Sequence, residues 1–363
     1  MNNMEFILSK IDSNLENFTD RFPAEQSIEY VYPAKECVSW TEGFWTGMLW
    51  LAYEITKDEK YEKIATHHTD IFKYRIENRI ATDTHDLGFL YTLSCVADYK
   101  ITGSEIAKNT ALNAADLLIE RYKPVGEFIQ AWGSLDDVNN YRLIIDCLLN
   151  LPLLYWATEV TGITKYKDIA ARHLKTALSV VIRDDFTTHH TYFFDPVSGK
   201  PTKGVTAQGY SDTSCWARGQ AWGIYGTALS YHYTKDETLI PIYKNLTQCF
   251  ISRLPSDYIP YWDMVFTDGD EPRDTSAAAI AICGIFEMNK YINEPKYVEV
   301  ADAMLTSLSE NYTTKDMPYS NGILKDGMYA KPYGDKPECN IWGDYYYMEA
   351  LMRKENRDWR IYW

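Results

Sequence analysis

Two kinds of predicted helix alternate along the 363-residue chain, and this alternation constrains the fold more than any other feature. Helices of the first kind are apolar on nearly every side, which is typical of helices that are buried on all faces. Six segments have this character, and they span residues 41–61, 84–106, 140–166, 218–239, 274–297 and 342–355.

Helices of the second kind have one apolar stripe and one charged face. Five of them follow an apolar segment after a short turn, as Ser104–Tyr122 and Thr164–Ile182 do, and Asn3–Phe18 is a sixth. A single hairpin of such helices cannot bury its apolar faces, whereas stacking around a ring buries them all. We therefore predict an all-α (α/α)6 barrel of six inner and six outer helices, in one domain over residues 1–363. An open helical solenoid is the alternative.

The longest predicted loops all precede the apolar helices, so a barrel would gather them at one rim. They span residues 124–139, 184–216, 255–273 and 313–341. The second of these loops contains "THHTYFFDPVSGK", which is compatible with a small hairpin. Long loops gathered on one side of a scaffold usually build a binding or catalytic site, and we expect the site at this rim.

Charge and composition exclude several classes of protein. The net charge of -15 argues against nucleic acid and anionic membranes as partners. No segment approaches the roughly 18 uncharged apolar residues of a membrane span, and the charged, amphipathic start is unlike a signal peptide. Seven cysteines lie singly, which predicts reduced packing residues in a cytoplasmic protein. Aromatic residues reach 15%, and stacking on sugar rings is one use for them.

Common cofactor and nucleophile motifs do not occur in the sequence: HExxH, GxGxxG, a P-loop, GxSxG and an EF-hand are all missing. The seven histidines are not spaced like a metal site. A hydrolase or lyase that uses neither metal nor cofactor, or a binding protein, is therefore expected.

Asp146 lies within the apolar run "LIIDCLLN", where an unpaired charge would be costly to bury. One interpretation is structural: on a helix, Arg142 and Asn150 lie one turn away and would form an ion pair or an amide contact with it. The other interpretation is a proton donor, because a carboxylic acid in apolar surroundings keeps its proton to higher pH.

Asp86 begins a predicted inner helix in "ATDTHDLGF", and a helix N-terminus favours an ionised carboxylate. It is either an ordinary capping-region residue or the charged partner of a protonated Asp146, since two carboxylates in contrasting environments are typical of an acid and its stabiliser. Further polar and aromatic candidates occur near the same rim, namely Trp40, His85, Trp132, His190, Gln208, Arg218 and Trp222.

Longer motifs run through nearly the whole chain, among them "SWTEGFWTGMLWLAYE", "HDLGFLYTLS", "RLIIDCLLNLPLL", "QGYSDTSCWARGQAWGIYG" and "IWGDYYYMEALMR". Together they resemble unsaturated glucuronyl hydrolases of glycoside hydrolase family 88. The resemblance implies a cytosolic (α/α)6 barrel without metal or cofactor. It also implies an unsaturated uronyl disaccharide as substrate, released by polysaccharide lyases from glycosaminoglycans, with 4,5-unsaturated glucuronate at its non-reducing end.

The resemblance further implies a reaction and a set of roles. In this family a carboxylic acid protonates C4 of the vinyl ether, water adds to C5, and the hemiketal that forms expels the aglycone. The implied acid is Asp146, and Asp86 is the implied partner that holds sugar hydroxyls. The other implied contacts are sugar-stacking tryptophans, two histidines at the hydroxyls and reaction centre, and a polar clamp at the uronate, namely Trp40, Trp132, Trp222, His85, His190, Gln208 and Arg218.

Two other functions compete with this one. A sister family removes unsaturated galacturonate from a rhamnose-linked disaccharide of pectin on the same barrel, and a sugar-binding toroid would have no catalytic activity. The loop "LKDGMYAKPYGDKPECN" also departs from relatives that favour sulfated sugars, which tend to place serines and a lysine there. Ala330 and Tyr333 offer no serine hydroxyls, while Lys331 and Lys336 remain available to a sulfate.

Overall fold

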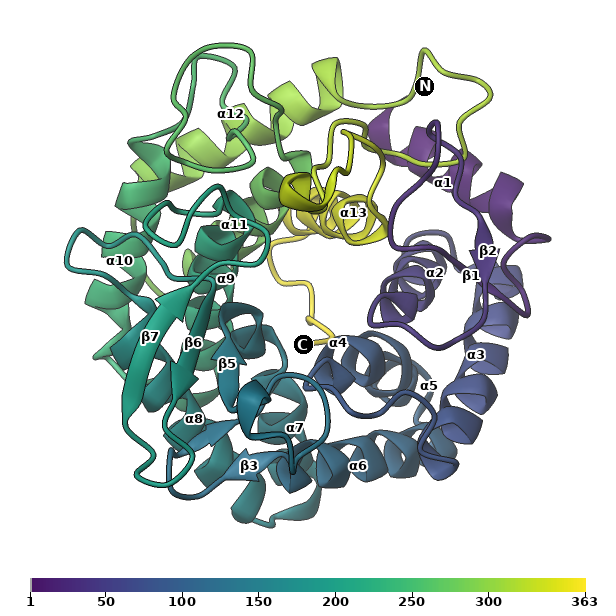
Figure 1. Cartoon of the computed structure of the whole chain (residues 1–363). Coiled ribbons are helices and arrows are strands. Elements are labelled where there is room, and N and C mark those ends of the chain that lie inside the picture. The colour runs from purple at the N-terminus through teal and green to yellow at the C-terminus, as the bar shows by residue number, and fades with distance from the viewer. Residues whose placement is uncertain (1) are drawn as a thin grey trace.

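The computed structural model describes residues 2–363 and contains two concentric rings of helices (Figure 1). Five positions of the inner ring are single helices, and the second position is divided into α4, a π-helical turn (Thr92–Val96) and α5. The inner ring comprises α2 (Glu42–Thr56), α4 (Leu87–Tyr91), α5 (Ala97–Thr102), α7 (Leu151–Thr161), α9 (Ala217–Thr234), α11 (Thr275–Met288) and α13 (Ile341–Glu355).

The outer ring comprises α1 (Asn3–Asn14), α3 (Glu59–Glu77), α6 (Glu105–Glu120), α8 (Lys165–Val181), α10 (Leu239–Ile251) and α12 (Pro295–Asn311). The ring closes because α13 packs against both α11 and α2, which excludes an open solenoid. The predicted (α/α)6 barrel is thereby confirmed. No helix among residues 2–363 is long and apolar enough to cross a membrane.

The two kinds of helix differ in burial as their sequences predict. In α11 nearly every side chain is buried, and Asp274 caps its start by accepting hydrogen bonds from the Ser276 and Ala277 N–H groups. Helix α8 buries only one stripe, which includes Ile169, Leu174 and Val181. The seven cysteines are all buried and unpaired, as predicted.

The predicted inner helix over residues 140–166 is wrong at its start. Residues Arg142–Ile144 form strand β5, Ile145–Leu149 form a 3-10 turn, and α7 begins only at Leu151. Strand β5 pairs with β6 (Thr191–Phe194), which pairs in turn with β7 (Pro201–Val205). This sheet contains the hairpin predicted within 184–216, and its pairing with β5 overrides the local helical pattern of the apolar run.

The remaining strands are two-residue pairs within the loops: β1 (Phe22–Pro23) with β2 (Ala34–Lys35), and β3 (Tyr122–Lys123) with β4 (Phe128–Ile129). The long loops precede the inner helices and therefore meet at the rim where those helices begin, as predicted. The opposite rim carries the short turns that lead from inner to outer helices, such as Gly103 and Gly162 in left-handed conformation.

Two inner segments come into direct contact where α4 begins and the 3-10 turn ends. A Cβ atom placed on Gly88 would lie 2.3 Å from Asn150 Cα and 2.5 Å from Asn150 Oδ1. At this short distance Asn150 forms hydrogen bonds with both segments. Its Oδ1 accepts from Phe89 N–H at 2.9 Å, and its Nδ2 donates to Asp146 O at 3.3 Å. Only glycine at position 88 permits this approach.

Gly88→Ala is expected to lower the free energy of unfolding by about 1–3 kcal/mol, because the new methyl group overlaps backbone atoms that cannot rotate away. Gly223→Ala is the matched control within α9, since its Cβ would meet Leu246 Cδ1 at an ordinary 3.4 Å. Urea unfolding of both variants is the measurement. Equal stability of the two variants would contradict the importance of this contact.

Candidate active site

A cavity of about 280 Å³ opens at the rim where the inner helices begin. Its wall combines residues from the long loops with residues at the starts of α4 and α9 and on the 3-10 turn. Every residue predicted for the site lies in this wall except His85, which is buried behind it. The wall is made of Trp40, Asp86, Trp132, Asp146, His190, Ala207, Gln208, Trp216, Arg218, Trp222, Tyr329, Ala330, Tyr333 and Asp335.

The two candidate carboxylates converge on one histidine. His85 Nε2 lies 3.3 Å from Asp86 Oδ1 and 3.2 Å from Asp146 Oδ1, although neither approach is aligned as a hydrogen bond. Desolvation opposes protonation of His85, but the charges of Asp86 and Asp146 outweigh it and raise the pKa of the imidazole. The arrangement therefore suits an imidazolium held between two acidic groups.

The environments of the two carboxylates differ from the expectation. The Asp86 side chain is 8% exposed, against 18% for Asp146. Burial raises the pKa of Asp86, the His85 charge opposes this, and the nearby Asp146 adds to it. The helix N-terminus was expected to keep Asp86 ionised, but the Asp86 side chain makes no capping hydrogen bond. Both carboxylates line the cavity, and Asp86 is thus the more deeply buried of the pair.

The structural partners considered for Asp146 lie elsewhere. Because Arg142 is on a strand, its guanidinium packs over the Trp132 ring at 4.8 Å and the Phe193 ring at 5.2 Å. Asn150 bonds to the Asp146 backbone carbonyl, at the 3.3 Å given above. Neither side chain forms an ion pair or hydrogen bond with the Asp146 carboxylate among residues 2–363, which excludes the structural interpretation based on these two partners.

His190 is brought beside Asp146 by the sheet, because Ile145 N–H donates to His190 O at 3.0 Å. Its Nδ1 accepts the backbone N–H of Ala207 at 3.0 Å, which places the proton of the neutral ring on Nε2. Desolvation lowers the pKa of His190 to about 4, so the ring is neutral near pH 7. His190 therefore offers a single N–H donor to a molecule in the cavity.

Arg218 is buried and already has acceptors. Its Nη1 donates to Asp274 Oδ2 at 2.6 Å and to Met328 O at 2.8 Å, and its Nη2 donates to Tyr329 O at 2.6 Å. Desolvation lowers its pKa, and the Asp274 charge counteracts this. Arg218 thus holds the loop before α13 in place as part of the cavity wall. Gln208 reaches the wall on the loop after β7.

The three predicted tryptophans differ in how much ring surface they present. Trp132 is 38% exposed, whereas Trp222 is 1% exposed and lies at the cavity floor against Phe89 and Tyr346. Trp40 is half-buried, packs on Trp342 at 5.0 Å between ring centroids, and donates from Nε1 to Tyr329 Oη at 3.2 Å. The most open stacking surface is therefore Trp132.

Sequence reasoning missed several residues of the wall. Trp216 packs on His190 at 4.3 Å between centroids and under the Arg218 guanidinium at 4.5 Å. It lies in "SCWARG", two residues before Arg218, and this position was the available signal. Tyr329 and Asp335 come from the loop before α13, where no periodic pattern shows which side chains turn inward.

His85, Asp86 and Asp146 are also the one group within residues 2–363 whose potential metal-ligating atoms all lie within 4.8 Å of one another. The spacing of the histidines along the chain does not predict this group, because its other two members are carboxylates. Burial of His85 and Asp86, with the raised pKa of the imidazole, favours a shared-proton cluster.

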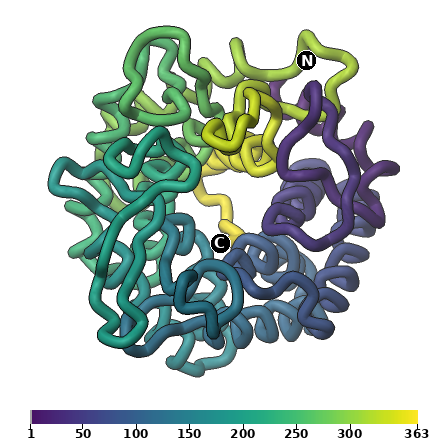
Figure 2. Tube along the Cα trace, viewed as in Figure 1, coloured from purple at the N-terminus to yellow at the C-terminus, as the bar shows by residue number. Residues whose placement is uncertain are grey.

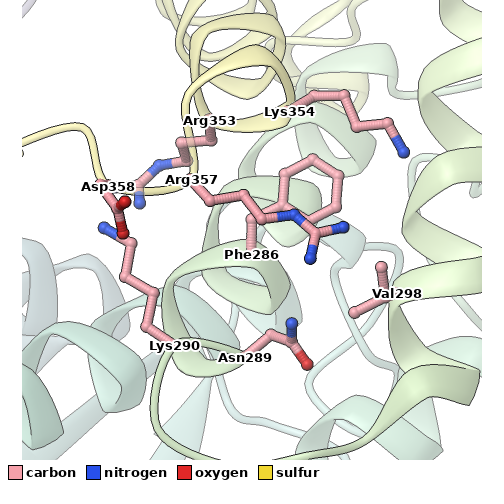
Figure 3. A pocket seen from close by; sticks show the side chains of 8 residues that line it. All are labelled: Phe286, Asn289, Lys290, Val298, Arg353, Lys354, Arg357 and Asp358. Carbon is pink, nitrogen blue, oxygen red and sulfur yellow. The ribbon is translucent and has the colours of Figure 1, made fainter.

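A second hollow, of about 260 Å³, lies at the opposite rim between the ends of α11 and α13 and near α12 (Figure 3). Its cations are mostly paired. Arg353 forms ion pairs with Glu287 and Glu349, and Lys354 with Asp302. This hollow contains none of the candidate catalytic residues.

Comparisons with known proteins show which family the chain and its fold resemble. The model of Glycosyl Hydrolase Family 88 matches residues 10–359. An unsaturated chondroitin disaccharide hydrolase of Streptococcus pneumoniae is 48% identical, over 98% of this chain and 92% of that protein. An unsaturated glucuronyl hydrolase of Bacillus sp. is 41% identical, over 94% and 93%. The crystal structure of unsaturated glucuronyl hydrolase from Streptococcus agalactiae has a TM-score of 0.96 at 47% identity, covering 100% of this chain and 94% of that one.

The His85 cluster predicts a pH dependence of stability. A raised pKa means that protonated His85 stabilises the fold, and this contribution is lost as pH rises through a value above the ordinary 6.5. Unfolding free energies of the wild type and of His85→Gln, measured between about pH 6 and 9, should therefore differ in slope, with the steeper alkaline loss in the wild type. His67→Gln, at an exposed position of α3, is the control. Parallel curves for the wild type and His85→Gln would contradict the cluster.

Proposed function

The chain belongs to glycosyl hydrolase family 88, and we propose that it is an unsaturated glucuronyl hydrolase acting on lyase-generated glycosaminoglycan oligosaccharides. It would remove the 4,5-unsaturated glucuronate from the non-reducing end. The observation that carries the proposal is the pairing of Asp86 and Asp146 on one histidine, in a tryptophan-lined cavity of this family's barrel. The names of relatives at 41–48% identity support the substrate class.

Asp146 is proposed as the proton donor because it is the most exposed member of the cluster, with 18% of its side chain exposed against 8% for Asp86 and 1% for His85. It would transfer to C4 of the vinyl ether a proton that it receives from the His85 imidazolium 3.2 Å away, and water would add to C5 and return a proton to the Asp146 carboxylate. The hemiketal formed at C5 then opens and releases the second sugar. Carboxylate separation carries no information about retention or inversion here, since C1 is not attacked.

Asp86 and His85 are proposed to support this transfer. The Asp86 Oδ2 atom accepts a hydrogen bond from Thr84 Oγ1 at 2.6 Å, which fixes the carboxylate beside His85. A fixed group of this kind can hold the sugar hydroxyls and stabilise positive charge at the reacting ring. His190 would donate its Nε2–H near the reaction centre.

The sugar itself is proposed to lie against the tryptophan walls. Trp132, the most exposed of them, would stack on a sugar face, with Trp40 and Trp222 completing the enclosure. Gln208 would bind the uronate. Arg218 would contribute its charge from within the wall, where Asp274 and two backbone carbonyls accept hydrogen bonds from its Nη atoms and fix the guanidinium.

The loop before α13 supports a preference for unsulfated sugars. Ala330 and Tyr333 line the cavity without a serine hydroxyl. Lys331 forms an ion pair with Glu271 and packs over the Trp262 ring at 5.3 Å, so a sulfate would have to compete with Glu271 for it.

We also propose that the chain forms one catalytic domain over residues 1–363, because α13 closes the ring against α2. A cytoplasmic location is proposed on the state of the cysteines. All seven are buried and free, which is typical of a reducing compartment.

Asp146→Asn is expected to lower turnover by about 10²–10⁴-fold, the usual contribution of a general acid, while the disaccharide still binds. Turnover is followed as loss of absorbance of the conjugated double bond, and binding by calorimetry. Asp98→Asn, a buried aspartate of α5 bonded to Thr69 and Thr102, is the control for the isosteric change. A wild-type rate in Asp146→Asn would refute the assigned acid.

A substrate comparison tests the proposed specificity. We expect faster turnover of an unsaturated chondroitin disaccharide than of its 6-sulfated form, by about tenfold, which corresponds to about 1.4 kcal/mol. The unsaturated galacturonyl-rhamnose disaccharide should be the poorest of the three. Preference for the pectin disaccharide would favour the sister activity, and binding of all three without loss of absorbance would favour a sugar-binding toroid.

A further inference from the structure

Residues 356–363 follow α13 and run into the centre of the barrel from the rim opposite the cavity (Figures 1 and 2). This tail is held inside the ring by its large side chains. Trp359, Ile361, Tyr362 and Trp363 are all buried, and Trp363 is 0% exposed. The tail is therefore part of the barrel interior.

Hydrogen bonds fix the position of Trp363. Its indole Nε1 donates to Glu349 Oε2 at 2.8 Å, and Glu349 is itself paired with Arg353. Its carbonyl accepts from Tyr233 Oη at 2.8 Å and from Lys100 Nζ at 3.2 Å. Three inner-ring segments, α5, α9 and α13, thus hold one tryptophan on the barrel axis by hydrogen bonds in addition to its packing contacts.

The Trp363 ring supports two rings that lie beneath the cavity floor. It stacks on Tyr346 with 5.9 Å between centroids and an interplanar angle of 8°, and it meets the Phe89 ring edge-on at 6.1 Å. Tyr346 and Phe89 in turn contact Trp222, at 5.6 Å and 5.5 Å. Trp363 is therefore two contacts away from Trp222, which lines the cavity.

Phe89 also links these packed rings of Trp363, Tyr346 and Trp222 to the carboxylates. It is in α4, whose first turn follows Asp86, and its backbone N–H binds Asn150, which bonds to the Asp146 carbonyl. A shift of Phe89 toward the opposite rim would thus move Trp222 and alter the separation of the two carboxylates. Trp363, which reaches Phe89 from the side of the opposite rim, packs against the ring and opposes this shift.

We propose that Trp363 is a positioning residue for the reaction: from the far side of the barrel, it holds Phe89 and Trp222 so that the cavity floor and the Asp86–Asp146 pair keep their geometry. The inference rests on the proposed hydrolase activity. It assigns the 356–363 tail a part in catalysis although no atom of the tail lines the cavity.

The test compares three variants at a temperature where each is folded, as checked by thermal melting. Trp363→Leu keeps apolar volume but loses the ring and its N–H, and we expect kcat to fall about tenfold, since small misplacements of reacting groups are costly. Trp363→Phe keeps a ring against Phe89 and Tyr346 and should recover most of the loss. Trp359→Leu is the matched control, because Trp359 lies in the same tail and binds Glu54, and its ring packs on Tyr362 and Arg353 rather than on Phe89, Tyr346 or Trp222.

A tenfold loss of kcat in Trp363→Leu, with recovery in Trp363→Phe and a kcat within twofold of wild type in Trp359→Leu, would support the proposal. Lowered melting temperatures with kcat within twofold of wild type in both leucine variants would overturn it and leave Trp363 with a purely stabilising role. Equal loss of kcat in both leucine variants would also overturn it, because the effect would then belong to the tail as a whole. An inactive wild type would instead contradict the proposed function.

Discussion

The contact between Gly88 and Asn150 determines where both candidate carboxylates lie. Asn150 binds the first turn of α4 through Phe89 N–H and the 3-10 turn through Asp146 O, so one side chain joins the two segments that carry Asp86 and Asp146. The contact is possible because position 88 has no Cβ atom. The distances from His85 to the two carboxylates, and with them the electrostatics of the cluster, depend on this junction.

Small residues at the inner-ring contacts allow close packing elsewhere as well. A Cβ on Gly226 would lie 2.3 Å from Leu148 Cβ, and one on Gly284 would lie 2.8 Å from Tyr225 Cα. Close helix contacts leave the barrel axis to be filled by aromatic rings, which bury large areas and pack edge to face. The high aromatic content of the chain thus has two uses, as stacking surface at the cavity and as the filling beneath it.

The buried charged groups discussed below are of two kinds: some form ion pairs that hold helices together, and others lie beside the cavity without an aligned partner. Arg75 with Glu42, and Arg353 with Glu287 and Glu349, are paired at the usual distances and hold helices together. Atoms of His85, Asp86 and Asp146, in contrast, remain buried without an aligned hydrogen bond. Unsatisfied titratable groups beside a cavity are typical of a functional site, because a structure that needed only stability would have paired or removed them.

The two-ring barrel, the rim of the candidate site and more than half of the cavity wall could be predicted from the sequence, because burial periodicity and loop placement are local properties of the chain. The strand and the 3-10 turn over residues 142–149 could not be predicted from the sequence, because the strand that pairs with residues 142–144 is far away along the chain. The same holds for the packing of Arg142 on Trp132, for the deeper burial of Asp86 than of Asp146, and for the position of Trp363 under the cavity floor. These features depend on contacts between segments that are distant in the sequence, and the hydrophobic periodicity of a single sequence does not report such contacts.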